Sequence, residues 1–507
     1  MLDATPILKA YARWRLDRLA RQDAVAHQQR LLLRLAKRAA GTRFGLDHGF
    51  ARLRSVADYQ SAVPLRRYDD YWQTYWRPAF PRLHNVTWPG TIPYFANSSG
   101  TSSGVTKHIP VSHAMMRANQ RAAIDLLVHH IANRPRSHIL GGRNFMLGSS
   151  TALTPLAPGV AMGDLSGIAA RHVPWWARNR YFPSGALASL TNWEEKTQRL
   201  ARQSVREDIR SISGTPSWLL LFFEQLQEMA PGGGQHLARH YPDLELVAHG
   251  GVSFAPYRAR FTALLAGGHA ETREVYPASE GFIAIADRGP DDGLRLLADN
   301  GLFFELVPVE ELSSRTPMRH WLATAELDVD YALVLSTCAG LWSYIVGDTV
   351  RLVSLHPPRL FVTGRTSYSL SAFGEHLIGE EIERAVSEAA DTIGANVVDF
   401  TVGPVFAGRG HHLYLVEFHE TAPDDRLAMF CQTVDQLLSA SNADYADHRK
   451  GDFGMGPPQV LALPPGAFAA WMKARGKLGG QNKVPRVTAD PEALQRLIAS
   501  LSGKRIE

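Results

Sequence analysis

The sequence predicts an α/β protein: a large N-terminal domain of mixed β-sheets with flanking helices, followed by a small α+β C-terminal domain. Short apolar runs typical of strands alternate with helical periodicities in the first part of the chain. Several of these runs end in polar turns that contain glycine, the position at which α/β proteins bind ligands. Past Thr363 the chain has a smaller set of elements, so we expect domains at 1–364 and 365–507.

The composition indicates a folded protein of several domains. The 507 residues are 45% hydrophobic and 20% charged, and at roughly 150 residues per domain they predict about two to four domains. The two cysteines, Cys338 and Cys431, lie far apart without a C-x-x-C motif, which argues against disulfide or zinc scaffolds. No apolar run approaches the roughly 20 residues of a membrane span, and no signal pattern opens the chain. We therefore expect a cytoplasmic protein without membrane contacts.

The stretch through Arg38 is basic and has the pattern of two amphipathic helices. Because the net charge of the whole chain is only +5, we interpret its arginines as solvated helix faces. A nucleic-acid or membrane contact is the alternative, and we expect neither a nucleic-acid nor a membrane partner.

The other elements follow in order along the chain. Tyr94 begins a strand that runs into a loop rich in serine, glycine and threonine, and Ser112 is placed to cap a helix over 113–131. Further strands are predicted at 244–248, 274–276, 302–307, 331–337, 342–346 and 360–363, with helices at 193–203 and 218–228. The C-terminal domain is predicted to contain helices at 379–390 and 426–440, strands at 397–402 and 413–418, and a mobile loop at 473–486.

The strongest local motif is the loop from Ser98 to Lys107, with the sequence SSGTSSGVTK. Its hydroxyls and backbone N–H groups can donate hydrogen bonds to phosphate oxygens, and Lys107 adds a positive charge before the next helix. Gly104 is followed by valine and threonine, which excludes a Walker A loop. The position between a strand and a helix favours phosphate binding over a surface linker.

Four motifs occur in the order seen in one family. The loop with Ile109-Pro110 is followed by YPASEG at 276–281, GLWSYIVGD at 340–348 and Gly364-Arg365. Together they resemble the acyl-acid amido synthetases, the plant auxin- and jasmonate-conjugating enzymes and their bacterial relatives, within the adenylate-forming superfamily. The resemblance runs from about residue 41 to residue 486. The stretch at 366–376 is more similar to the bacterial relatives, which leaves the plant hormones doubtful as substrates.

The resemblance assigns ATP and Mg²⁺ to these motifs. It implies a phosphate cradle in the loop with Lys107 as a helper, and it implies that Glu280 holds Mg²⁺, which prefers hard oxygen ligands. It also implies that Tyr276 stacks on adenine, that Asp348 binds the ribose hydroxyls, and that Arg365 contacts ribose or phosphate. The other implied nucleotide contacts are Ser98, Ser99, Gly100, Thr101, Gly251, Val252, Ser253 and Ser279. For each side chain the alternative is an ordinary core, turn or surface role.

Two C-terminal lysines compete for a catalytic role beside Lys107. Lys483 lies in the tract GGQNKVPR at 479–486, which resembles the family segment that closes over the α-phosphate. A cation there would offset the charge that develops as a carboxylate displaces pyrophosphate. Lys477 stands in a Gly-Lys-Leu context similar to the catalytic lysine loop of the superfamily, so it remains a rival. The alternative for both is a basic tail without a role in catalysis.

Two further sets of residues carry less weight. Trp175 and Trp176, with Phe182 and Pro183 downstream, are candidates for an acyl pocket, although aromatic residues more often pack in cores. The pairs His129-His130 and His411-His412 do not predict a metal site, because neighbours in a strand point to opposite faces and a histidine at a helix end suits the helix dipole.

These assignments predict a ligase that uses ATP and Mg²⁺ to convert a carboxylic acid to acyl-AMP and then transfers the acyl group to an amine, by resemblance an amino acid. The resemblance implies that the C-terminal domain is mobile and reorients about Gly364-Arg365 for the second step. Two alternatives share the nucleotide site: an acyl-CoA ligase, and a catalytically silent nucleotide-binding protein. We expect a monomer or a weak homodimer.

Overall fold

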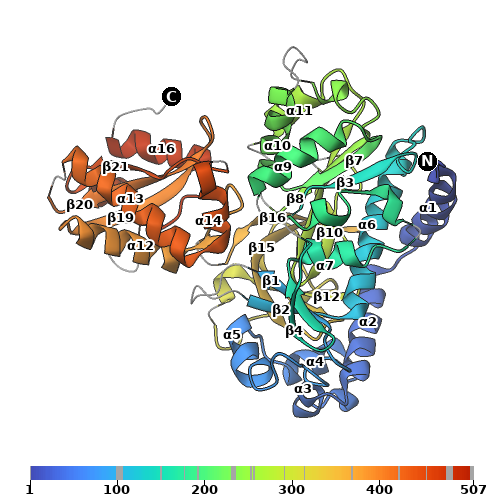
Figure 1. Cartoon of the computed structure of the whole chain (residues 1–507). Coiled ribbons are helices and arrows are strands. Elements are labelled where there is room, and N and C mark those ends of the chain that lie inside the picture. Colours follow the sequence, from blue (N-terminus) through green and yellow to red (C-terminus); the bar gives the residue numbers. More distant parts are fainter. Residues whose placement is uncertain are drawn as a thin grey trace. The chain divides into compact units, whose positions relative to one another are not determined.

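The computed structural model divides into two compact units (Figure 1). It describes residues 2–98, 107–148, 151–175, 177–190, 193–229, 236–251, 254, 257–289, 292–312, 314–366, 369–420, 423–452, 454–475 and 484–502. The first unit contains the described residues through Thr366, and the second contains those from Ser369 onward. The prediction of a large α/β N-terminal part and a smaller C-terminal part is confirmed.

Two sheets form the centre of the first unit, and the described residues give them twelve and four strands. The larger sheet has the order β13 (His320–Trp321), β12 (Leu302–Pro308), β14 (Asp330–Thr337), β15 (Tyr344–Leu355), β16 (Pro358–Arg365), β11 (Leu294–Leu296), β10 (Gly281–Ile285), β9 (Glu271–Ala278), β8 (Leu246–Gly250), β7 (Ile209–Gly214), β3 (Arg143–Met146) and β6 (Tyr181–Phe182). The smaller sheet has the order β2 (Lys107–Val111), β1 (Tyr94–Ser98), β5 (Val160–Gly163) and β4 (Thr154–Ala157).

One part of the larger sheet is parallel. β6, β3, β7, β8 and β9 run in the same direction, so their carboxyl ends lie along one edge. All five residues of β8 are buried, which is typical of a parallel strand covered on both faces. Because ligand sites of such sheets form beyond the carboxyl ends, this edge is where a site is expected.

The larger sheet curls between β9 and β15. These strands are separated by β10, β11 and β16, so a flat sheet would hold them about 19 Å apart at ~4.8 Å per strand. Nevertheless, Tyr276 on β9 forms a hydrogen bond of 2.5 Å with Asp348 on β15. Register shifts in the β9–β10 and β15–β16 pairs mark positions where the ladder bends. The curl therefore brings side chains of two strands that are not neighbours in the sheet into contact.

Helices cover the sheets of the first unit (Figure 1). The hydroxyl of Ser112 accepts a hydrogen bond from the Met115 N–H at 3.1 Å, which confirms the predicted cap of α6 (His113–Asn133). Buried Arg15 on α1 (Thr5–Ala20) pairs with Asp125 on α6 and with Asp299, each at 2.7 Å. The other α-helices are α2 (Ala24–Ala39), α3 (Arg43–Asp47), α4 (Val56–Ala62), α5 (Tyr68–Tyr71), α7 (Leu165–Arg171), α8 (Gly185–Ala188), α9 (Trp193–Ser204), α10 (Pro216–Met229) and α11 (Arg258–Leu265).

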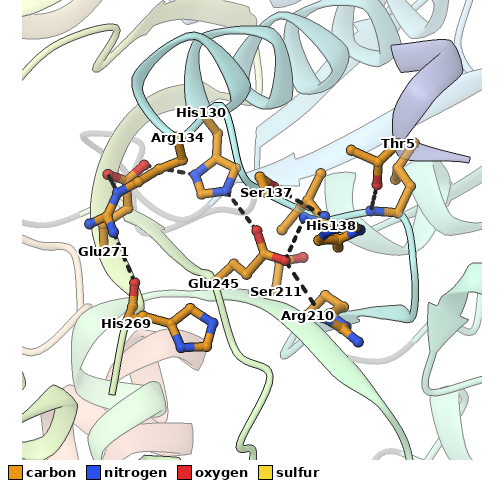
Figure 2. Close-up of polar contacts among 12 residues, drawn as sticks. Thr5, His130, Arg134, Ser137, His138, Arg210, Ser211, Glu245, His269 and Glu271 are labelled. Carbon is orange, nitrogen blue, oxygen red and sulfur yellow. Dashed lines mark hydrogen bonds and ion pairs between the residues drawn. The ribbon is translucent and has the colours of Figure 1, made fainter. Parts of the chain in front are cut away.

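A buried polar network ties the end of α6 to the start of the parallel strands (Figure 2). His130 lies between two carboxylates: its Nδ1 is 2.7 Å from Glu271, and its Nε2 is 3.4 Å from Glu245. Arg134 also binds Glu271, at 3.1 Å. Burial by itself would lower the pKa of His130, but the two carboxylates raise this pKa above its ordinary value. The network lies at the amino ends of β8 and β9, away from the edge where a ligand site is expected, and we interpret it as structural.

The second unit is an α+β structure with its own hydrophobic core. Its described residues form the sheet β19 (Val397–Val405), β20 (His411–Phe418) and β21 (Gln459–Leu463), and the pair β17 (Ser369–Leu370) and β18 (Leu377–Ile378). Its helices are α12 (Gly379–Thr392), α13 (Asp424–Ser441), α14 (Ala443–Arg449), α15 (Ala467–Ala474) and α16 (Pro491–Ser502). Phe400, Val416 and Phe430 belong to its core. His412 is fully buried and pairs with buried Glu375 at 2.8 Å, which gives this histidine a structural role.

The chain continues from the predicted phosphate loop into a strand, not directly into a helix. Lys107 begins β2, which pairs antiparallel with β1 so that Ser98 lies opposite Lys107. Ile109 and Val111 on β2 are fully buried, and β-branched residues pack well on such a surface. The prediction of a strand–loop–helix unit was therefore wrong at this point, because a five-residue strand that begins with Lys-His gives too short an apolar pattern.

Candidate functional site

The candidate site begins at the carboxyl ends of β8 and β9. Gly250 pairs with Val275, and a Cβ on Gly250 would lie 2.1 Å from the Val275 carbonyl oxygen, so only glycine permits this approach. Gly251 follows with a φ of +89°, which favours glycine and turns the chain at the strand end. Tyr276 comes directly after Val275 on β9. The structure thus places the predicted Gly251 turn at the end of the strand next to the one that carries Tyr276.

Tyr276 and Asp348 meet across the curl of the sheet. The Tyr276 hydroxyl donates to Asp348 Oδ2 at 2.5 Å, and both side chains are buried. Gly347, directly before Asp348, has a φ of +104°, in the left-handed region that favours glycine. The residues predicted to bind adenine and ribose therefore lie in contact, and the hydrogen bond orients the carboxylate.

Glu280 lies at the same site, in the turn between β9 and β10 that also contains half-buried Ser279. It is only 6% exposed. Burial and the nearby Glu280 carboxylate raise the pKa of the Tyr344 phenol well above its ordinary value. Tyr344 and Asp348 both lie on β15, whose pairing with β14 shifts register between Ile345 and Thr349. Glu280 and Asp348 are therefore linked through one strand.

Lys107 adds a positive charge beside these residues. Its Nζ lies 5.9 Å from the centre of the Tyr68 ring, and the Tyr68 hydroxyl accepts a hydrogen bond from the His108 N–H at 3.0 Å. Burial raises the pKa of Tyr68 to about 12, so the phenol stays neutral. Tyr68 is also close enough to Tyr344 to contribute to the raised pKa of that residue. Sequence reasoning did not single out either tyrosine: Tyr344 stands inside a recognised motif, whereas Tyr68 has no comparable signal.

The end of the first unit borders the same strand. Arg365 lies opposite Asp348 in the β15–β16 pair, and the Thr366 N–H donates to the Gly347 carbonyl at 2.8 Å. The structure describes only the backbone of Arg365 and of Ser98. Eight other predicted residues lie outside the described residues, and their roles stay predictions: Ser99, Gly100, Thr101, Trp176, Val252, Ser253, Lys477 and Lys483.

A cavity of about 230 Å³ lies at the carboxyl ends of β3 and β6. Phe182 and Pro183, which were named with the predicted acyl pocket, line it. Trp175 is 80% exposed and does not line the cavity. Sequence reasoning missed Lys196 on α9, a lysine of the cavity wall that is only 2% exposed, because the polar sequence of this helix does not distinguish it from a surface residue.

Neither a metal-binding cluster nor a membrane-spanning helix occurs among the described residues. They contain no group of three or more His, Cys, Asp or Glu side chains placed to hold a metal ion. Mg²⁺ needs no such cage, because it commonly binds through one or two carboxylates together with substrate phosphates. A single buried carboxylate such as Glu280 at the strand edge fits that requirement. Among the described helices, none combines the length and apolar character that crossing a membrane requires.

Two solved structures have the same fold as this chain. An acyl acid amido synthetase in complex with 2,4-DB has a TM-score of 0.62 and 20% identity over 97% of this chain and 96% of that chain. A 2-hydroxyisobutyryl-CoA ligase in complex with 2-HIB-AMP and CoA has a TM-score of 0.58 and 15% identity over 94% of this chain and 92% of that chain. The chain therefore shares the fold of this acyl acid amido synthetase and this acyl-CoA ligase.

Sequence comparison identifies the family. Residues 17–269 match the GH3 family N-terminal domain, 295–365 its central domain and 380–492 its C-terminal domain. An indole-3-acetic acid-amido synthetase of Oryza sativa subsp. indica is 24% identical over 559 aligned positions, with 94% of this chain and 90% of the relative covered. A probable indole-3-acetic acid-amido synthetase of Oryza sativa subsp. japonica is 26% identical over 345, with 62% and 75% covered. The chain belongs to the GH3 family, which confirms the resemblance to acyl-acid amido synthetases.

Proposed function

We propose that this chain is a ligase that uses ATP to convert a carboxylic acid to acyl-AMP and then transfers the acyl group to an amino acid. The observation that carries the proposal is the contact between Tyr276 and Asp348, with Glu280 at the same sheet edge. Membership of the GH3 family supports it, since the curated relatives are named as amido synthetases. Their names specify indole-3-acetic acid, whereas for this chain the acid remains to be found by assay.

Each part of ATP can be assigned to described residues of the site. The Tyr276 ring would stack on adenine, while its hydroxyl holds the Asp348 carboxylate ready to accept the ribose hydroxyls. Lys107, together with the loop that follows Ser98, would contact the phosphates. Glu280 would hold Mg²⁺, which when bound supplies positive charge against the phosphate oxygens.

The C-terminal part would complete the reaction. As acid carboxylate attacks the α-phosphorus, negative charge develops that Lys483, or its rival Lys477, would offset. The segment from Arg365 onward would then supply the surroundings for attack by the amine on the acyl carbon, with release of AMP. Exclusion of water during this step would protect the mixed anhydride from hydrolysis.

The first test is carboxylate-dependent exchange of labelled pyrophosphate into ATP with a panel of aryl, indolyl and aliphatic acids. We expect exchange with at least one class, lowered about 10²- to 10³-fold in Glu280→Gln and Lys483→Ala. Lys477→Ala separates the two lysines, and Glu388→Gln, an exposed carboxylate on α12, is the matched control. Absence of exchange with every acid, in a folded protein that binds ATP, would contradict the proposal.

The acceptor is tested with the acid found in that panel. We expect AMP release to rise when amino acids are added and the product to be an amide, identified by mass spectrometry. Release that rises only with coenzyme A would contradict the amide-forming step while leaving adenylation intact.

A further inference from the structure

The cavity beside β3 and β6 is lined by positive charge and by no described carboxylate. Lys196 forms part of its wall, and its Nζ donates to the carbonyls of Gly148 at 2.9 Å and Ala188 at 3.3 Å. Arg171 and Arg178 also line it, and both are exposed to solvent. Burial lowers the pKa of Lys196 to about 8, although the charge of nearby Asp164, which does not line the cavity, opposes this shift, and the ammonium stays mostly charged at neutral pH. The cavity is thus a cationic environment.

The rest of the lining identifies the kind of anion that fits. Met146, Val173 and Phe182 supply apolar surface, while Thr151, Ser166 and Tyr181 supply polar groups. A cavity of about 230 Å³ with such walls suits part of a small organic molecule. An inorganic phosphate would leave the apolar surface uncovered, so the lining favours an organic anion.

The cavity lies on the same sheet edge as the candidate nucleotide site. β3 is separated from β9 by β7 and β8, and all four strands are parallel. At ~4.8 Å per strand, the end of β3 lies about 14 Å from the end of β9. A substrate that reacts beside Tyr276 and Asp348 could therefore extend along this edge into the cavity.

We propose that this cavity is a carboxylate-binding subsite in which Lys196, Arg171 and Arg178 bind a substrate carboxylate that does not itself react. The inference rests on the proposed function for the identity of the reaction. Two substrates could supply the group: a second carboxylate on the acid, or the carboxylate of the amino-acid acceptor. Both present the same planar anion, for which arginine is a suited bidentate partner.

Direct titration of the full-length chain with adipate and with hexanoate tests the cavity without turnover, since the two differ only in the second carboxylate. We expect adipate to bind at least about tenfold more tightly, and Arg171→Gln and Arg178→Gln each to weaken it about five- to tenfold. Arg199→Gln is the control, because Arg199 lies on the same helix as Lys196 but is exposed and does not line the cavity. Lys196→Met removes the buried charge, and the two arginine variants keep the test decisive if that variant fails to fold.

The same titration with alanine and with alaninamide tests whether the cavity binds the carboxylate of the amino-acid acceptor.

Kinetics distinguish the two sources. If the acid supplies the carboxylate, Arg171→Gln lowers the preference for dicarboxylic over monocarboxylic acids in pyrophosphate exchange. If the amino acid supplies it, Arg171→Gln leaves pyrophosphate exchange unchanged but lowers the preference for alanine over alaninamide in AMP release. Either outcome supports the subsite. Unchanged titrations and unchanged preferences in both arginine variants would overturn it. If the wild-type protein shows no pyrophosphate exchange with any acid, the proposed function is contradicted. The titrations would then still show whether the cavity binds a carboxylate.

Discussion

At the scale of single residues, the candidate site depends on a few polar groups held by packing. Asp348 follows a glycine with positive φ, and its carboxylate receives the Tyr276 hydroxyl. Because both side chains are buried, neither samples many rotamers, and the carboxylate is oriented before a ligand arrives. Binding then costs less conformational entropy than it would with a mobile carboxylate.

We expect substitutions of Asp348 and Tyr276 to weaken ATP binding to different extents. Asp348→Asn removes a charged acceptor and is expected to raise the KM for ATP about 10- to 100-fold, whereas Tyr276→Phe, which removes only the orienting hydroxyl, is expected to raise it about fivefold. Steady-state kinetics at saturating acid measure both. Asp17→Asn on the exposed face of α1 should leave the KM for ATP unchanged. A rise confined to the KM of the acid would show that the pair serves the acyl site.

At the scale of elements, His130 fastens the end of α6 to β8 and β9 (Figure 2). The pKa of His130 is raised above its ordinary 6.5, so its contribution to stability is full below about pH 6.5 and is lost as pH rises through the folded value. Burial opposes ionisation of Glu271, but His130 and Arg273 lower the pKa of this carboxyl from 4.5 to about 2. Its contribution is present above about pH 4.5 and is lost as pH falls toward 2. The network therefore contributes most to the stability of the folded protein between about pH 4.5 and pH 6.5.

Urea unfolding measured at a series of pH values tests this pH dependence of stability. His130→Gln is expected to lower the free energy of unfolding by about 1–3 kcal/mol at pH 5.5. The difference from the wild type should shrink as pH rises through the folded pKa of His130, and also as pH falls toward 3, where Glu271 begins to bind a proton. His84→Gln, at an exposed histidine outside this network, is the control. A difference that stays constant across the series would mean that packing, not charge, explains the effect.

At the scale of the whole molecule, the two units have separate hydrophobic cores. The core of the second unit contains Phe430, which is fully buried and packs edge-on against Phe418 at 5.7 Å. The first unit is held by other clusters, the largest of which includes Trp342 and Tyr344. We therefore expect each unit to lose structure without an equal loss in the other.

Phe430→Ala in the full chain tests this independence. It is expected to destabilise the second unit by about 3–5 kcal/mol. Hydrogen exchange followed by mass spectrometry should then show faster exchange within 369–502 and unchanged exchange in β7, β8 and β9. Met429→Ala is the matched control, since the neighbouring Met429 is 51% exposed. Equal acceleration in both parts would indicate one cooperative structure.

The sequence by itself was enough to predict many of the observed strands and helices and to locate the family motifs. The strand predicted at 331–337 is observed as Asp330–Thr337, and the helix predicted at 113–131 as His113–Asn133. Both succeed because a buried strand and a capped helix have local patterns that depend on few neighbours. The motif order was likewise enough to identify the family, although it did not reveal that Lys107 begins a strand.

Only the tertiary structure decided which of these residues meet. Tyr276 and Asp348 are 72 residues apart and come together because the sheet curls, a property of many strands at once. The partnership of Tyr68 with Lys107 and the burial of Lys196 in a cavity wall depend in the same way on elements distant in sequence. Local periodicity carries no information about such contacts, since they arise when separate elements pack to bury their apolar faces.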